Sequence, residues 1–68
     1  MLKLASEVRV GDRVRVKFLD DGEWEESDTL TVQHLEPGID APIRASCATE
    51  EGEPWGIFWW PNDEVEVV

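Results

Sequence analysis

The last third of the chain alternates between apolar stretches and turn residues, and this pattern favours short strands over any helix. Residues 43–47 alternate in polarity and indicate one strand, which glycine and proline end at residues 52–54. Residues 55–60 are uncharged and hold three of the four tryptophans, which indicates a second strand. Residues 61–63 fit a single 3₁₀ turn before a closing strand. The residues expected to face the core are Ile43, Ala45, Cys47, Val65 and Val67.

The first half of the chain predicts two further strands. Residues 13–18 alternate strictly, with Val14, Val16 and Phe18 on the face expected to be buried and a row of bases on the other. That row is expected to pair with acids on neighbouring strands. Residues 29–35 form the next predicted strand, and Leu35 breaks its alternation, so we expect a bulge or a strand end near His34. The charged stretch 20–28 between the two is predicted to be a long open loop rather than a tight hairpin.

The length of 68 residues predicts a single domain over residues 1–68 with a small core. A chain of this size gains only about 3–5 kcal/mol of net stability from such a core, so it needs dense packing or a second copy of itself. One cysteine excludes an internal disulfide and favours a reducing, cytoplasmic location. No apolar run is long enough to span a membrane or to act as a signal peptide.

The charge is strongly negative and unevenly distributed. Residues 1–19 carry five bases and two acids, while residues 20–68 carry one base and fourteen acids, so net charges of +3 and −13 make up the total of −10. Such a surface repels nucleic acid and acidic membranes. A strongly negative surface keeps a protein in solution without aggregation. The same surface could bind a protein partner with a basic surface, or could mimic the phosphate backbone of DNA.

The chain resembles small SH3-like barrels, including the KOW and Tudor types. Residues 10–16 are similar to their opening strand, and residues 52–60 and 63–67 are similar to their turn, aromatic strand and last strand. The resemblance covers about residues 8–68 and implies an all-β, five-stranded barrel with a 3₁₀ turn before the last strand. Small barrels of this kind also occur among accessory proteins of bacteriophages. RNA-binding KOW modules are basic, however, so the acidity of this chain argues against direct nucleic-acid binding.

The aromatic strand supplies the candidate binding residues. Only one face of a strand can point into the barrel, and we expect Phe58 and Trp60 there, because such barrels usually bury an aromatic residue before the 3₁₀ turn. Trp55 and Trp59 would then point outward, beside Trp24 on the first loop, as in SH3-like domains, where these aromatics line a ligand groove. Acids surround them and suit a cationic or proline-rich ligand. The predicted partner-binding residues are Trp24, Trp55, Trp59, Glu23, Glu25, Glu51 and Glu53.

The function expected first is that of a non-enzymatic module that binds and modulates a host protein. Several alternatives remain. The tryptophans could all be packed, or could form a homodimer interface. The acids of residues 23–28 and 50–53, expected on one side of the barrel, could make an inhibitor that mimics DNA. Tryptophans of two subunits could bind a small ligand such as a nucleotide signal. Catalysis, a cofactor and a metal are not expected, because His34 and Cys47 are single residues on separate strands.

Overall fold

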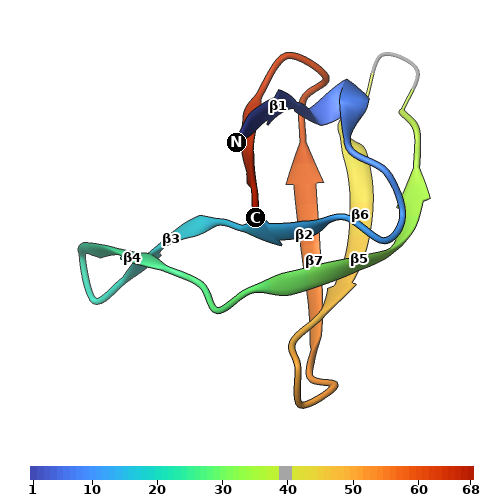
Figure 1. Ribbon diagram of the computed structural model, residues 1–68. Coiled ribbons are helices and arrows are strands. Elements are labelled where there is room, and N and C mark those ends of the chain that lie inside the picture. Colours follow the sequence, from blue (N-terminus) through green and yellow to red (C-terminus); the bar gives the residue numbers. More distant parts are fainter. Residues whose placement is uncertain (39–40) are drawn as a thin grey trace.

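The protein is all-β, as the sequence predicts (Figure 1). A computed structural model describes residues 1–38 and 41–68. In this part of the chain there are eight strands and one short 3₁₀ helix, Ala5–Glu7. The strands are β1 (Leu2–Leu4), β2 (Arg13–Arg15), β3 (Lys17–Asp20), β4 (Glu23–Glu26), β5 (Leu30–Glu36), β6 (Ile43–Ala48), β7 (Pro54–Trp59) and β8 (Glu64–Val67).

Six strands form one antiparallel sheet in the order β1-β8-β2-β5-β6-β7, and among the described strands β3 pairs only with β4. The strands β2, β5, β6 and β7 follow one another, and the chain then returns so that β8 lies between β1 and β2. Within residues 1–38 and 41–68 no ladder joins β1 to β7, so the sheet keeps two edges. In this part of the chain the sheet therefore has six strands rather than the expected five, a separate hairpin accompanies it, and the ladders do not close a barrel.

The core lies on the inner face of the sheet and consists mainly of small aliphatic side chains. Leu30 and Val14 have no exposed surface, and Val32 is 1% exposed. The inward positions predicted on residues 43–47 and 65–67 are buried, and so are Leu30 and Val32, because alternate residues of each strand share a face. The buried cluster comprises Ala5, Val8, Val14, Leu30, Val32, Ile43, Ala45, Cys47, Trp59, Val65 and Val67.

The predicted bulge near His34 is confirmed. Val32 pairs with Cys47, but His34 pairs with Ser46, so Gln33 is the extra residue on β5. The bulge restores Leu35 to the inner face, where it packs against the core. One inserted residue therefore explains why the apolar alternation of this strand changes phase.

The predicted open loop over residues 20–28 is wrong, because these residues form a tight hairpin. β3 and β4 pair from Lys17 opposite Glu26 to Asp20 opposite Glu23, and the two-residue turn is Asp21-Gly22. Both turn residues have positive φ, 50° and 78°. Such a turn is of type I′, whose twist matches that of the flanking strands. We call residues 17–26 the arm, which projects from the sheet in Figure 1.

Replacing Gly22 with alanine should destabilise the arm by about 1 kcal/mol, because a side chain is strained at φ 78°. Hydrogen exchange of the Phe18 and Glu25 amides, which form a hydrogen-bonded pair of the arm ladder, measures the effect and should become faster. Gly56→Ala is the matched control, since an added Cβ there meets no atom within 4 Å and the backbone is not left-handed. Equal exchange rates in the wild type and Gly22→Ala would contradict this account of the turn.

The predicted continuous strand over residues 13–18 is divided at Val16. The Val16 N–H donates to Ser27 Oγ at 3.0 Å, and the Ser27 N–H donates to the Val16 carbonyl at 2.8 Å. Ser27 is buried at this junction. These bonds fasten the base of the arm to the sheet where β2 ends and β3 begins.

The predicted single 3₁₀ turn at residues 61–63 has its expected backbone hydrogen bond between residues three apart and forms a β-turn. The Asp63 N–H donates to the Trp60 carbonyl at 2.9 Å, and the Trp60 N–H donates to Asp63 Oδ2 at 2.8 Å. The carboxylate satisfies the N–H of the first turn residue, and Pro61 suits the second position of the turn.

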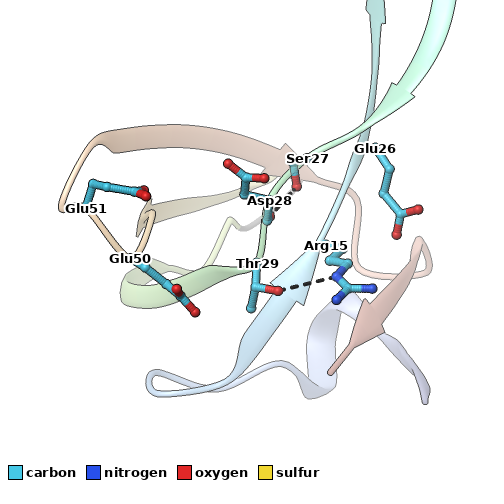
Figure 2. A pocket seen from close by; sticks show the side chains of 7 residues that line it. All are labelled: Arg15, Glu26, Ser27, Asp28, Thr29, Glu50 and Glu51. Carbon is cyan, nitrogen blue, oxygen red and sulfur yellow. Dashed lines mark hydrogen bonds between the residues drawn. The ribbon is translucent and has the colours of Figure 1, made fainter.

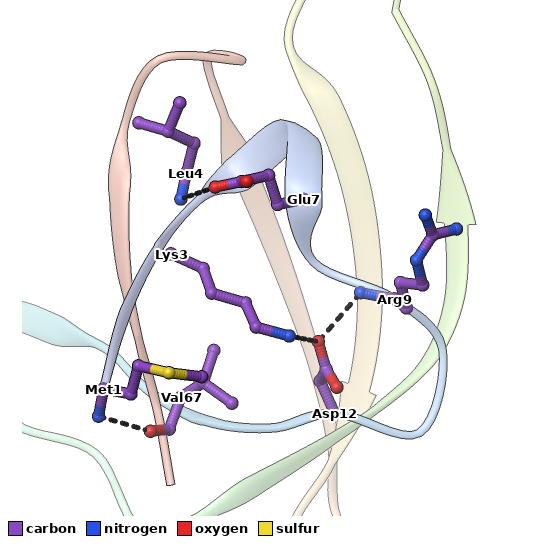
Figure 3. A network of polar contacts seen from close by, with 7 residues as sticks. All are labelled: Met1, Lys3, Leu4, Glu7, Arg9, Asp12 and Val67. Atoms are coloured by element: carbon purple, nitrogen blue, oxygen red, sulfur yellow. Dashed lines mark hydrogen bonds and ion pairs between the residues drawn. The ribbon is translucent and has the colours of Figure 1, made fainter.

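The first residues of the chain are held against the sheet by polar contacts (Figure 3). The Met1 ammonium group donates to the Val67 carbonyl at 2.9 Å. Asp12 Oδ2 accepts from the Arg9 N–H at 3.0 Å and lies 3.4 Å from Lys3 Nζ. These contacts fix β1 beside β8, although Leu4 and Leu2 face solvent.

Candidate functional site

The two faces of β7 are the reverse of those predicted. Trp59 is only 7% exposed and belongs to the core, whereas Phe58 and Trp60 are 64% and 56% exposed. The register explains the difference: Trp59 pairs with Ile43, and residues paired directly across two strands share a face. Because Ile43 points inward, Trp59 must do so too. The prediction that Trp59 is an exposed binding residue is therefore wrong.

Trp55 is half-buried and connects the sheet to the arm. Its ring meets the Phe18 ring edge-to-face, with the centroids 5.6 Å apart and the planes at 69°. This geometry is favourable for aromatic pairs. Trp55 therefore helps to position the arm, and it is not the outward-pointing residue that the sequence led us to expect.

Trp24 does lie on the surface, as predicted. It is 70% exposed on β4 and stands opposite Leu19, which is also exposed. Glu23 and Glu25 are exposed on the same strand, and Glu51 and Glu53 are exposed at the turn between β6 and β7. The predicted site residues therefore fall into two groups. The acids and Trp24 lie on two exposed segments, whereas Trp55 and Trp59 pack inside the protein.

A hollow of about 440 Å³ lies between the end of the arm and the turn after β6 (Figure 2). The arm end contributes Glu26, and the segment after it contributes Asp28; the turn contributes Glu50 and Glu51. The expectation that these two groups of acids share one side is confirmed for these four residues. The other lining residues are Arg15, Ser27 and Thr29.

The bases of β2 lie beside these acids. Arg13 forms an ion pair with Glu50 at 3.1 Å, and Arg15 Nε donates to Thr29 Oγ1 at 3.3 Å. Arg15 stands opposite Glu66 on β8, so the row of bases does lie beside acids of neighbouring strands. Four carboxylates and one guanidinium line the first hollow, which leaves it with a negative potential.

A second hollow of about 380 Å³ adjoins the first, because Arg15 and Glu26 border both. It contains apolar surface from Val16, Trp59 and Val65. Its remaining lining residues are Leu2, Lys17, Glu64 and Glu66. We call the two adjoining hollows the arm groove. Sequence reasoning placed Trp59 near a ligand but missed the groove, because its walls come from segments far apart in the chain.

Cys47 and His34 do not resemble a reactive pair. Cys47 is buried, and desolvation raises the pKa of its thiol, so the nucleophilic thiolate is disfavoured. His34 is exposed, with Nε2 3.4 Å from Glu36 Oε1. In the part of the chain that the structure describes, no three His, Cys, Asp or Glu side chains are grouped as metal ligands.

Comparisons of the chain with models of protein families, with curated proteins and with solved structures give no match. Among residues 1–38 and 41–68 there is also no helix with the length and hydropathy needed to cross a membrane. Inferences about function therefore rest on the groove and the exposed side chains.

Proposed function

We propose that the protein is a non-enzymatic interaction module that binds a basic, partly apolar segment of a protein partner in the arm groove. One observation carries this proposal. The acidic hollow and the hollow with apolar surface meet at Arg15 and Glu26, which border both. A segment with a cationic side chain next to an apolar one matches both hollows at once.

The first hollow suits a lysine or arginine side chain. Asp28 and Glu51 approach it from opposite sides, and Glu26 lies at its border with the second hollow (Figure 2). An ion pair at 4 Å contributes about 1 kcal/mol in bulk water and more where the surrounding protein lowers the dielectric constant. A guanidinium group would also donate two parallel hydrogen bonds to one carboxylate.

The second hollow and the arm provide apolar contact area. Among the residues that line the second hollow, Leu2 is exposed and Val16 is partly buried, so these two offer apolar surface to a ligand side chain, whereas Trp59 and Val65 are almost fully buried. Trp24 and Leu19 extend the apolar area along the arm. Exposed tryptophans are common among the residues that dominate binding energy at interfaces, which supports a role for Trp24.

An SH3-like architecture is part of the proposal. The strand order β8-β2-β5-β6-β7 supports it, because the last strand lies beside β2 and the others follow in sequence. The arm occupies the place of the first loop, and Phe18 brings it against Trp55 of the aromatic strand. A role as a bacteriophage accessory protein remains a prediction from the resemblance, the small size and the acidity.

Mimicry of DNA is the second candidate, and the gathering of Asp28, Glu50 and Glu51 favours it. Two bases interrupt the acids, however, since Arg13 pairs with Glu50 and Arg15 lines the hollow. A continuous phosphate-like track has no such interruption. A phosphorylated small ligand is the weakest candidate, because the carboxylates of the hollow would repel it.

Two synthetic peptides of equal charge test the proposal. One contains arginines next to leucines, and the other has glycines in place of the leucines. We expect the leucine peptide to bind more tightly by calorimetry and to retain binding at high salt, since apolar contacts are not screened. If both peptides bind with equal affinity and both lose binding at high salt, the proposal is contradicted, and general attraction to the acidic surface is favoured.

A further inference from the structure

The outer edge of β7 lacks the features that usually protect an edge strand. β7 pairs with β6 on one side, and in the described part of the chain no strand pairs with its other side. Residues 54–60 contain no charged side chain and no bulge, and their only proline is the first residue. Charges, internal prolines and bulges are the usual means of preventing edge-to-edge pairing. In a chain with a net charge of −10, this edge is a place where a second acidic copy can approach without direct repulsion.

The side chains on the outer face of this edge are self-complementary. Their order along the chain is Pro54, Gly56, Phe58 and Trp60, so two small residues precede two large ones. Phe58 and Trp60 are exposed, and the space above Gly56 is open, since an added Cβ meets no atom within 4 Å. When such a strand meets its own antiparallel copy, each large residue lies opposite a small one.

The backbone donors at this edge are correctly placed for pairing. The Thr49 N–H donates to the Glu53 carbonyl, and hydrogen-bonded pairs alternate with non-bonded pairs along an antiparallel ladder. Residues 55, 57 and 59 therefore direct their N–H and carbonyl groups toward β6. The same groups of Gly56 and Phe58 point to the open edge.

We propose that the protein forms a two-fold dimer in which β7 pairs antiparallel with β7 of a second copy, with the axis at Ile57. Gly56 then stands opposite Phe58 of the second copy, and each pair exchanges its N–H and carbonyl bonds. Pro54 stands opposite Trp60 of the second copy. The two sheets join into one continuous sheet, and the exposed aromatic rings cover the glycine and proline positions.

The geometry limits the pairing to this segment. Pro54 has no N–H, and the Trp60 N–H is already bonded to Asp63 Oδ2, so the ladder ends at both residues.

Arg44 lies over the Phe58 ring, 5.8 Å from its centroid, and adds a base beside the interface of an acidic protein. On the inner face, Ile57 is half-buried and would contact Ile57 of the second copy. Trp59 belongs to the paired segment and also lines the arm groove, but Phe58, which the dimer test changes, lines neither hollow, so the two proposals can fail separately.

Sedimentation velocity tests the dimer. We expect the wild type to sediment as a dimer as its concentration rises from the micromolar to the millimolar range. Phe58→Glu should remain monomeric, because it removes the ring and places like charges near the axis. Val10→Glu is the control, since it adds the same charge at an exposed position in the loop before β2 and should still dimerise. A monomeric wild type, or equal dimerisation of both variants, would overturn the proposal.

A cysteine at the axis tests the register. Opposite residues of a non-bonded pair have Cα atoms about 4.5 Å apart, within the range of a disulfide. Ile57→Cys should therefore form an intermolecular disulfide under mild oxidation, while Phe58→Cys should form much less. The buried Cys47 thiol, whose pKa is raised, should not compete. Equal cross-linking at both positions, or none at residue 57 in a sample that sediments as a dimer, would contradict this register.

Discussion

Replacing Trp59 with alanine is expected to unfold most of the protein at room temperature. Trp59 is 7% exposed and packs in the core beside Ile43, its partner on β6. Removing a buried tryptophan side chain costs about 3–5 kcal/mol, because the lost apolar contacts leave a cavity. A core of this size supplies only about 3–5 kcal/mol of net stability, so little or none would remain.

Urea denaturation followed by circular dichroism measures this effect. Trp24→Ala is the matched control, since it removes the same side chain from an exposed position on the arm. We expect the Trp24→Ala protein to unfold close to the wild-type midpoint. A Trp59→Ala protein that is fully folded but binds no partner would contradict the structure and restore the original view of Trp59 as an exposed binding residue.

Reversing two charges in the arm groove is expected to weaken binding of the leucine-containing basic peptide by about tenfold or more. The change Asp28→Lys with Glu51→Lys replaces two attractions with two repulsions on opposite walls of the first hollow. Each change of about 1.4 kcal/mol in binding free energy alters affinity tenfold, and pair energies near a surface are of that order. Isothermal titration calorimetry measures the loss.

A second double variant separates the groove from the overall charge. Glu7→Lys with Glu36→Lys changes the net charge by the same amount, and neither residue lines the groove. Its affinity for the peptide should stay within a small factor of the wild type. If both double variants lose the same affinity, the peptide responds to the total charge of the protein and the groove has no special role.

The faces of β7 show where sequence reasoning was insufficient. Both faces of residues 55–60 are apolar, so alternation alone cannot indicate which one is buried. The register across the turn after β6 decides it, because Cys47 pairs with Trp55 and both must point the same way. The inward positions of β6 were predicted correctly from the sequence. Combined with a turn centred on residues 50–52, they contained the information needed to place Trp59 in the core.

The arm shows a different reason for a wrong prediction. Asp21-Gly22 is a strong indication of a type I′ turn, but five acids and one glycine surround a single tryptophan in residues 20–26 and suggested a solvated loop. Exposed hairpins tolerate such a composition, because neither of their faces has to be fully buried. By contrast, the bulge at Gln33 was predictable, since the change of phase at Leu35 has few other physical explanations.

The groove could not be derived from local sequence patterns. Its acidic walls come from residues 26–28 and 50–51, and they meet because Phe18 packs on Trp55 and Ser27 bonds to Val16. Phe18 and Trp55 are distant in the chain. The bond between Val16 and Ser27 forms only because residues 17–26 fold back as a hairpin. The sequence indicated which residues are acidic and exposed, but only the fold determines that Arg15 and Glu26 border two hollows.

The most direct test of the proposed function is an NMR titration of the ¹⁵N-labelled protein with the leucine-containing basic peptide. We predict that the largest shifts occur at the amides of residues 26–29 and 50–51, which line the first hollow of the arm groove, and at the Trp24 indole on the adjoining arm. The amides of Gly56 and Phe58, which point to the outer edge of β7, should change little. Shifts spread evenly over all acidic segments, or confined to residues 56–60, would contradict the assignment of the groove as the binding site.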